Sequence, residues 1–181
     1  GYFKTSVWKH ARSRIVWLLV LMLSATITGA ITNHFEPLIS TVPLLVSFMS
    51  MLTGTGGNCG SQSSTMVIQG MAMEEIRLKD FFRVVFKEFR IALICSVILA
   101  AVNFVRIIFM YQNVKIAAIV SITLIGTVIL SKLLGCMLPM LAKKIHIDPA
   151  IMSAPLLSTL VDSCSTLLYF TIAMKILNVA V

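Results

Sequence analysis

Charged residues are scarce in this chain. They make up 12% of its 181 residues, and 58% of the residues are hydrophobic, whereas a soluble globular domain carries about 25% charged residues. Acidic residues are scarcer still, with seven Asp and Glu against 15 Lys and Arg. This composition excludes an ordinary soluble catalytic or nucleotide-binding domain, and the sequence contains no Walker-type phosphate loop.

Cysteine and histidine are too few and too scattered to predict a metal centre. The four cysteines lie inside apolar stretches and form no CxxC pair: Cys59, Cys95, Cys136 and Cys164. This pattern favours small buried residues over disulfide or thiolate sites. The three histidines have no ligand spacing between them: His10, His34 and His146. We therefore predict no zinc site.

Long apolar stretches are abundant instead. A membrane-spanning helix needs roughly 20 apolar residues, and five stretches meet this need, at about 15–35, 38–70, 91–110, 114–142 and 149–178. The second is mixed, because residues 42–52 are apolar while residues 53–64 are rich in glycine and hydroxyl side chains. We predict an all-α membrane protein with five transmembrane helices, forming a single transmembrane domain over 1–181 with a lead-in at 1–14 before the first span.

The segment 73–90 differs from these stretches because its charges alternate with apolar residues. Four phenylalanines lie among them: Phe81, Phe82, Phe86 and Phe89. A mixed pattern of this kind is typical of an amphipathic helix that lies at the membrane interface.

The basic residues predict the orientation of the chain. Eleven fall on alternate sides of consecutive spans, which is one side of the membrane: Lys4, Lys9, Arg12, Arg14, five within 77–90, Lys143 and Lys144. The other side carries only Arg106, Lys115 and Lys175, while Lys132 lies within the fourth span. The positive-inside rule then predicts a multi-pass plasma-membrane protein with a cytoplasmic amino terminus and an external carboxy terminus.

Asp162 lies near the middle of the fifth span, where a carboxylate costs about 2.5–3.5 kcal/mol to insert. One explanation is an ion pair with Lys132, the one intramembrane basic candidate. The other is a wetted ion path, which the small hydroxyl residues around Asp162 favour: Ser158, Thr159, Ser163, Ser165 and Thr166.

A second polar pattern lies in the second span. Five residues follow the spacing i, i+3, i+4, i+7 and i+11, which places them along one side of a helix: Gly54, Gly57, Asn58, Ser61 and Thr65. Close helix packing through Gly56 and Gly60 would explain the glycines, but not the accompanying amide and hydroxyl groups. We therefore interpret this polar stripe as the wall of a water-filled path.

Asp148 opens the fifth helix, with Pro149 in the first turn. It could cap the helix, attract ions at the cytoplasmic mouth, or do both. Fourteen residues separate it from Asp162, so the two lie nearly on one face and about 21 Å apart. That separation excludes an aspartyl protease, whose carboxylates must approach within about 3 Å, and we predict no enzyme.

Carboxylates in an oxygen-rich path select a hard cation. Two of five helices cannot enclose a pore, so we infer a twofold homodimer, the commonest closed symmetry. Paired carboxylates with hydroxyl and carbonyl groups suit Mg2+, which retains several waters. The same argument does not exclude Ca2+ or Mn2+ as the transported ion. Movement along the electrochemical gradient is predicted. A proton- or sodium-coupled exchanger and a purely structural membrane subunit are the alternatives.

Several motifs in order resemble the transmembrane domain of the MgtE magnesium channels, relatives of the eukaryotic solute-carrier magnesium transporters. They are the run Gly54-Thr-Gly-Gly-Asn-Cys-Gly-Ser-Gln62, then Asp148-Pro-Ala150, then Thr159-Leu-Val-Asp162 with Leu168-Tyr-Phe170 following. The resemblance covers essentially the whole chain. It implies a homodimer with five helices per subunit that surrounds a pore for hydrated Mg2+, with membrane lipids around it and no nucleic-acid partner.

The resemblance also implies roles for individual residues. Asp162 matches the central ion-binding aspartate, Ser158 a backbone carbonyl that holds the ion's waters, and Asp148 an aspartate at the cytoplasmic mouth. The second helix matches its pore-lining positions at Gly54, Gly57, Ser61 and Thr65, although Ser61 stands where some members carry Asn. Members of the family usually have an acidic helical domain and a paired CBS module before the pore. This sequence lacks both, so it is expected to be either a separated pore domain or a short form, and to conduct without Mg2+-dependent closure.

Overall fold

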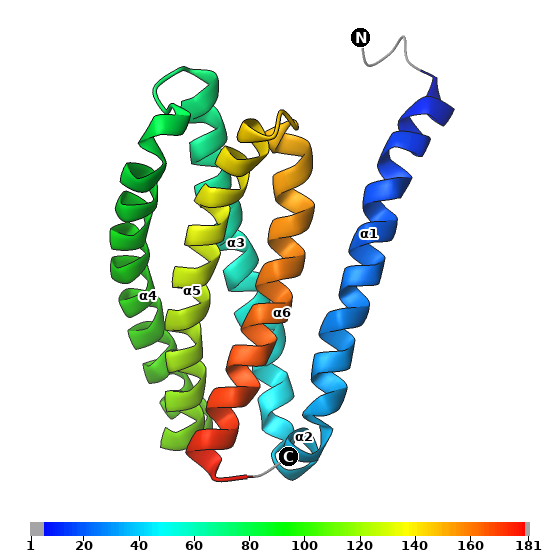
Figure 1. Cartoon of the computed structure of the whole chain (residues 1–181). Coiled ribbons are helices and arrows are strands. Elements are labelled where there is room, and N and C mark those ends of the chain that lie inside the picture. Colours follow the sequence, from blue (N-terminus) through cyan, green and yellow to red (C-terminus); the bar gives the residue numbers. More distant parts are fainter. Residues whose placement is uncertain (1–5, 180–181) are drawn as a thin grey trace.

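The computed structural model describes residues 6–179, and it describes only the backbone at Ser13 and at 150–154 (Figure 1). Lys4 therefore lies outside the described residues. Regular structure in the described part is entirely helical. Its elements are α1 (Val7–His34), α2 (Glu36–Thr41), the 3-10 turn η2 (Pro43–Leu45), α3 (Val46–Ala72), the 3-10 turn η3 (Leu78–Asp80), α4 (Phe81–Tyr111), α5 (Val114–Lys144) and α6 (Pro149–Leu177).

The long helices α1, α3, α4, α5 and α6 run alternately up and down between the same two ends of the molecule (Figure 1). One end holds the start of α1, η3 and the turn between α5 and α6. The opposite end holds α2, η2 and the turn between α4 and α5. Residues far apart in sequence therefore lie at the same end of the molecule. We call the first end the basic end, because it carries most of the basic residues: Lys9, Arg12, Arg14, five basic residues of 77–90, Lys143 and Lys144.

Four segments of the described chain are long and apolar enough to cross a membrane: Val7–His34, Leu78–Tyr111, Val114–Lys144 and Pro155–Leu177. They correspond to the first, third, fourth and fifth predicted spans, and they make this a multi-pass membrane protein. The helix α3 has 27 residues but is not among them. Its glycine, hydroxyl and amide residues between 53 and 64 account for its lower hydropathy.

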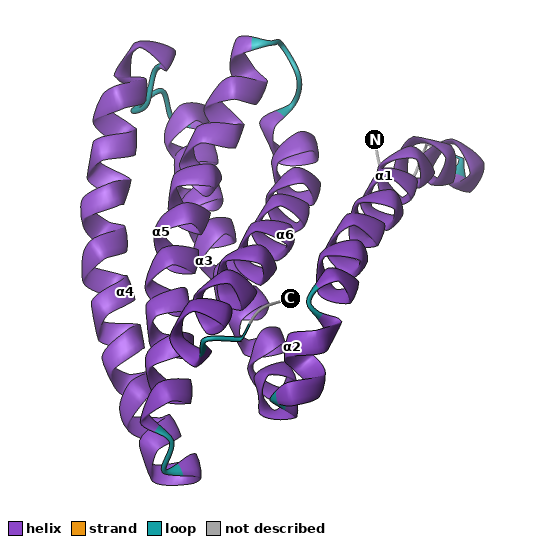
Figure 2. Ribbon diagram, turned by 60° about the horizontal axis from the view of Figure 1, so that its bottom comes forward, coloured by secondary structure: helices purple, strands orange, loops and turns teal. Residues whose placement is uncertain are grey.

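The helix α5 lies at the centre of the bundle and packs against α3, α4 and α6. Along its length it buries small and apolar residues on several sides, as a helix surrounded by neighbours requires. The helix α1 packs chiefly against α6 and diverges from the other helices toward its own start (Figure 2). Many of its apolar side chains are exposed, so the bundle proper consists of α3 to α6.

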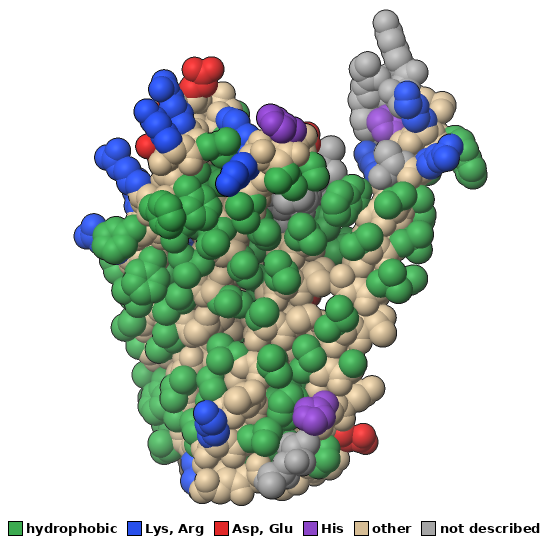
Figure 3. Space-filling view, viewed as in Figure 1, with side chains coloured by type: hydrophobic (Ala, Val, Ile, Leu, Met, Phe, Trp, Pro, Cys, Tyr) green, Lys and Arg blue, Asp and Glu red, His purple; other side chains and the backbone are tan. Residues whose placement is uncertain are grey.

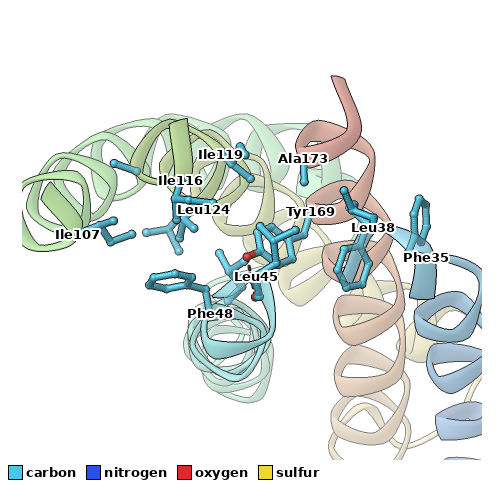
Figure 4. Close-up of a cluster of buried hydrophobic side chains, with 14 of the residues drawn as sticks. Phe35, Leu38, Leu45, Phe48, Ile107, Ile116, Ile119, Leu124, Tyr169 and Ala173 are labelled. Atoms are coloured by element: carbon cyan, nitrogen blue, oxygen red, sulfur yellow. Dashed lines mark hydrogen bonds between the residues drawn. The ribbon is translucent and has the colours of Figure 1, made fainter. Parts of the chain in front are cut away.

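A large apolar cluster closes the end of the bundle opposite the basic end (Figure 4). Tyr169 is buried in it and donates a 2.7 Å hydrogen bond to the carbonyl of Leu45, while Phe35 stacks on Phe170 with ring centroids 5.1 Å apart. The contacts join η2 and the turn before α2 to α6. The lower parts of α3 and α6 are consequently held side by side.

The structure corrects the prediction of a separate amphipathic helix over 73–90. The amides of Glu75 and Ile76 both donate to the carbonyl of Gly70, at 2.9 and 3.0 Å, and Glu74 has a left-handed φ of 60°. These are the features of a helix C-terminal motif that reverses the chain. Only η3 follows the reversal, and α4 then begins at Phe81 and runs unbroken to Tyr111. The phenylalanines occupy the first turns of that long helix.

Candidate functional site

Asp162 lies within α6, and it is partly exposed. No residue whose side chain the structure describes gives it a hydrogen bond or an ion pair. Its neighbours face other helices, because Val161 is fully buried and the hydroxyl of Ser163 lies 2.9 Å from that of Thr28 on α1. A carboxylate at membrane depth with no protein partner needs water or a cation to offset its desolvation.

Two glycines set the heights of α3 and α6 relative to each other. A Cβ atom added to Gly56 would lie 2.7 Å from Val161 Cγ1, and one added to Gly60 would lie 2.9 Å from Leu157 Cδ1. The helices are antiparallel, so Asp162 lies near the height of Thr55, between Gly54 and Gly57. Ser158 lies near the height of Cys59, between Asn58 and Ser61. The structure therefore brings the predicted residues of the two helices to matching depths.

The helix α3 has two distinct faces. Gly56 and Gly60 are buried against α5 and α6, which confirms that they form a close packing contact, and the buried Ser63 faces α4 and α5. The polar stripe lies on another face: Gly54, Asn58, Ser61 and Thr65 are exposed and Gly57 is partly exposed. A Cβ atom added to Gly54 or Gly57 would meet nothing within 4 Å, so no described part of the chain covers them.

The structure does not support the ion pair considered between Lys132 and Asp162. Lys132 is 3% exposed, and its Nζ atom donates to Gln62 Oε1 at 3.0 Å and to Ser63 Oγ at 3.4 Å. Both acceptors belong to α3, which packs closely on α5. The sequence pattern did not predict this contact. The ammonium group of Lys132 thus has its hydrogen-bond acceptors on α3 and does not pair with Asp162.

The same contact continues to α4. Ser63 Oγ donates a 2.6 Å hydrogen bond to Glu88 Oε2, so one hydroxyl links the ammonium of Lys132 to a carboxylate. We call Lys132, Gln62, Ser63 and Glu88 the three-helix network. Sequence reasoning missed it because Glu88 lies in the charged segment that was interpreted as an interfacial helix. The one available signal was a lysine within an apolar span, which must have a partner.

The remaining predicted residues lie along α6. Ser158 is exposed and stands one turn before Asp162, so the two share a face. Asp148 is exposed immediately before the first residue of α6, at the basic end. Another hydroxyl contact was not predicted: Ser131 Oγ of α5 donates to the buried carbonyl of Gly56.

Among the described residues, no group of three or more His, Cys, Asp or Glu could hold a dehydrated metal ion. The predicted site residues are instead glycines, hydroxyl residues, one amide and single carboxylates. Such a set provides hydrogen-bond acceptors for the water shell of a cation.

Comparison with known proteins gives a consistent result. The family model MgtE, described as a divalent cation transporter, matches residues 49–172. The magnesium transporter MgtE of Bacillus subtilis (strain 168) is 37% identical over 94% of this chain and 38% of its own length. For the MgtE proteins of Thermus thermophilus and Enterococcus faecalis the identities are 33% and 29%, over 92% and 91% of this chain and 37% and 36% of theirs. The chain therefore spans less than two fifths of the length of these relatives.

Proposed function

The chain belongs to the MgtE family, and from that premise we propose that it forms the ion path of a magnesium transporter. In this proposal hydrated Mg2+ moves along its electrochemical gradient over the exposed polar faces of α3 and α6. The observation that carries it is the unpaired Asp162, at the depth of the uncovered polar stripe of α3. The relatives from Bacillus subtilis and Thermus thermophilus are magnesium transporters by name, which supports Mg2+ as the ion.

We propose that α3 is a fifth membrane-crossing helix and that the working unit is a homodimer. The polar stripe cannot face lipid without cost, because its amide and hydroxyl groups would lose their hydrogen bonds there. A second copy related by a twofold axis would enclose the stripe and bring two Asp162 side chains to one path. The measured mass of the purified protein in detergent tests this part, and a monomer that transports Mg2+ would refute it.

We further propose that the basic end faces the cytoplasm. It carries most of the described basic residues, and the opposite end carries Arg106, Lys115 and Lys175, a distribution that the positive-inside rule associates with this orientation. Asp148 would then lie at the cytoplasmic mouth and increase the local concentration of cations. The amino terminus would be cytoplasmic and the carboxy terminus external.

The decisive experiment measures Mg2+ uptake into proteoliposomes for the wild type and for Asp162→Asn. Hydrogen bonds to a charged group contribute about 1.5–3 kcal/mol, so we expect uptake to fall about 10–100-fold. Glu74→Gln is the matched control, since it removes one exposed carboxylate from the turn after α3 and should transport normally. A folded Asp162→Asn variant with unchanged uptake would refute the proposed path.

A coupled exchanger is the second candidate, because a lone carboxylate such as Asp162 can also relay protons. The two mechanisms differ in their driving force. Uptake that follows membrane potential and the Mg2+ gradient at equal internal and external pH supports a channel. Uptake that stops when the pH or sodium gradient is removed supports the exchanger.

A further inference from the structure

A groove runs between the start of α4 and the end of α5 at the basic end. Its volume is about 520 Å3, and its lining includes Lys79, Lys144, Phe81, Phe82, Met140 and Leu141. Phe81 and Met140 also contribute to an apolar cluster around Val67 and Cys136. Well-packed residues therefore hold the floor of the groove in place, while the two lysines stand at its rim.

The apolar surface continues from this groove along the membrane-spanning part of α4. Phe82 also borders a second hollow of about 400 Å3, together with Val85, Phe86, Phe89 and Leu133. Residues 82, 85, 86 and 89 share one face of a helix, and they extend for about 10 Å along its axis. Phe82 and Phe86 are 83% and 64% exposed, so an apolar strip leads away from the lysines.

The charge at the rim is of one sign. Lys79 and Lys144 are exposed, and no described residue forms an ion pair with either. The described lining of the groove contains no carboxylate. A neighbouring hollow between α3 and α4 differs, because Glu75, Asp80 and Glu88 lie there beside Arg83 and Lys87. Unlike that hollow, the groove combines unpaired positive charge with an apolar wall.

We propose that this groove binds an anionic phospholipid. The phosphate of the headgroup lies between Lys79 and Lys144, and an acyl chain follows the strip formed by Phe82, Phe86 and Phe89. Basic pockets between membrane helices attract anionic headgroups, and the space-filling view shows Lys and Arg side chains gathered above a largely apolar face (Figure 3). The proposal is independent of the ion path, which lies on α3 and α6.

The chemistry of the groove distinguishes a lipid from other occupants. A soluble phosphate would contact the two lysines alone, whereas an anionic lipid carries a phosphate and an acyl chain in one molecule and so matches both the basic rim and the adjoining apolar strip. A second copy of this chain would have to bring a carboxylate to both lysines. The acidic residues are scarce, with seven in the whole sequence, which argues against that arrangement.

Native mass spectrometry of the full chain in a neutral detergent can test the proposal by titration with phosphatidylglycerol or phosphatidylcholine. We expect phosphatidylglycerol to bind more tightly, and Lys79→Gln with Lys144→Gln to weaken its binding by about thirtyfold. The control is Arg83→Gln with Lys87→Gln, which removes the same charge at the same end but outside the groove, and which should reduce binding far less. A further arm adds inorganic phosphate in excess, which should not displace the lipid.

Four results would overturn the proposal. They are equal binding of the two lipids, equal losses in the two double variants, displacement of the lipid by inorganic phosphate, and a lysine double variant that changes only the number of chains in the complex. The second result would mean that charge attracts lipid diffusely over the basic end. The third would indicate a soluble anion site, and the fourth a contact between copies of the chain.

Discussion

Replacing single glycines by alanine separates the residues that pack α3 from those that face the proposed path. A Cβ atom added to Gly135 of α5 would overlap the carbonyl oxygen of Gly60 and lie 3.0 Å from its carbonyl carbon and Cα. These are backbone atoms, so only a separation of α3 and α5 can relieve the overlap. A Cβ atom added to Gly57 would meet nothing within 4 Å.

The magnitudes follow from these distances. Overpacking costs about 1–3 kcal/mol, and separation would also weaken the hydrogen bond from Ser131 to Gly56 by about 1 kcal/mol. Alanine recovers about 1 kcal/mol of helix propensity. Gly135→Ala should therefore lower the free energy of unfolding by about 1–3 kcal/mol. Gly57→Ala should leave stability unchanged or raise it by up to about 1 kcal/mol, yet reduce Mg2+ uptake by narrowing the path.

The assay pairs thermal unfolding in detergent with Mg2+ uptake per folded protein in proteoliposomes, for Gly135→Ala, Gly57→Ala and the wild type. Gly54→Ala serves as a second test of the uncovered face, because its added Cβ also meets nothing. If Gly57→Ala melted as early as Gly135→Ala, the stripe would be a packed contact between subunits. If it kept both stability and full uptake, Gly57 would not line the path.

Two further predictions concern buried polar contacts away from the path. Lys132→Met should destabilise the protein by about 1–3 kcal/mol, because Gln62 and Ser63 lose their charged donor and the partly buried Glu88 loses its linked cation. Adding Glu88→Gln should restore part of that loss in thermal unfolding, and strictly additive losses would contradict the three-helix network. Tyr169→Phe should cost about 1–3 kcal/mol, because the buried carbonyl of Leu45 loses its donor, and an unchanged melting temperature would contradict a structural role for that bond.

Hydropathy predicted the number and order of the long helices but not their ends. The first span was predicted from about residue 15, whereas α1 begins at Val7, after Ser6 accepts a hydrogen bond from the amide of Lys9. Lysine and arginine are good helix formers, so a helix continues beyond the membrane where hydropathy falls. Pro43 had the opposite effect, because it begins η2 and delays α3 until Val46.

The candidate site could be predicted in part. Asp162 and the polar stripe were visible in sequence because polar residues are costly at membrane depth and because helical spacing assigns them to a face. The partners of Lys132 were not visible. Which neighbour a buried side chain meets depends on how each helix is rotated about its axis, and periodicity in a single helix does not determine that rotation.

The packing glycines determine how α3 is rotated about its own axis, which the sequence pattern did not determine. Contact between the backbones at Gly60 and Gly135 fixes which side of α3 faces α5, and the bond from Lys132 to Gln62 forms on that side. Because the residues of the polar stripe lie on another side of the same helix, the contact that buries Gly60 also turns Gly57 and Ser61 outward. Close packing therefore involves Gly56 and Gly60, while the proposed wetted wall concerns Gly54 and Gly57, which the same packing turns away from α5.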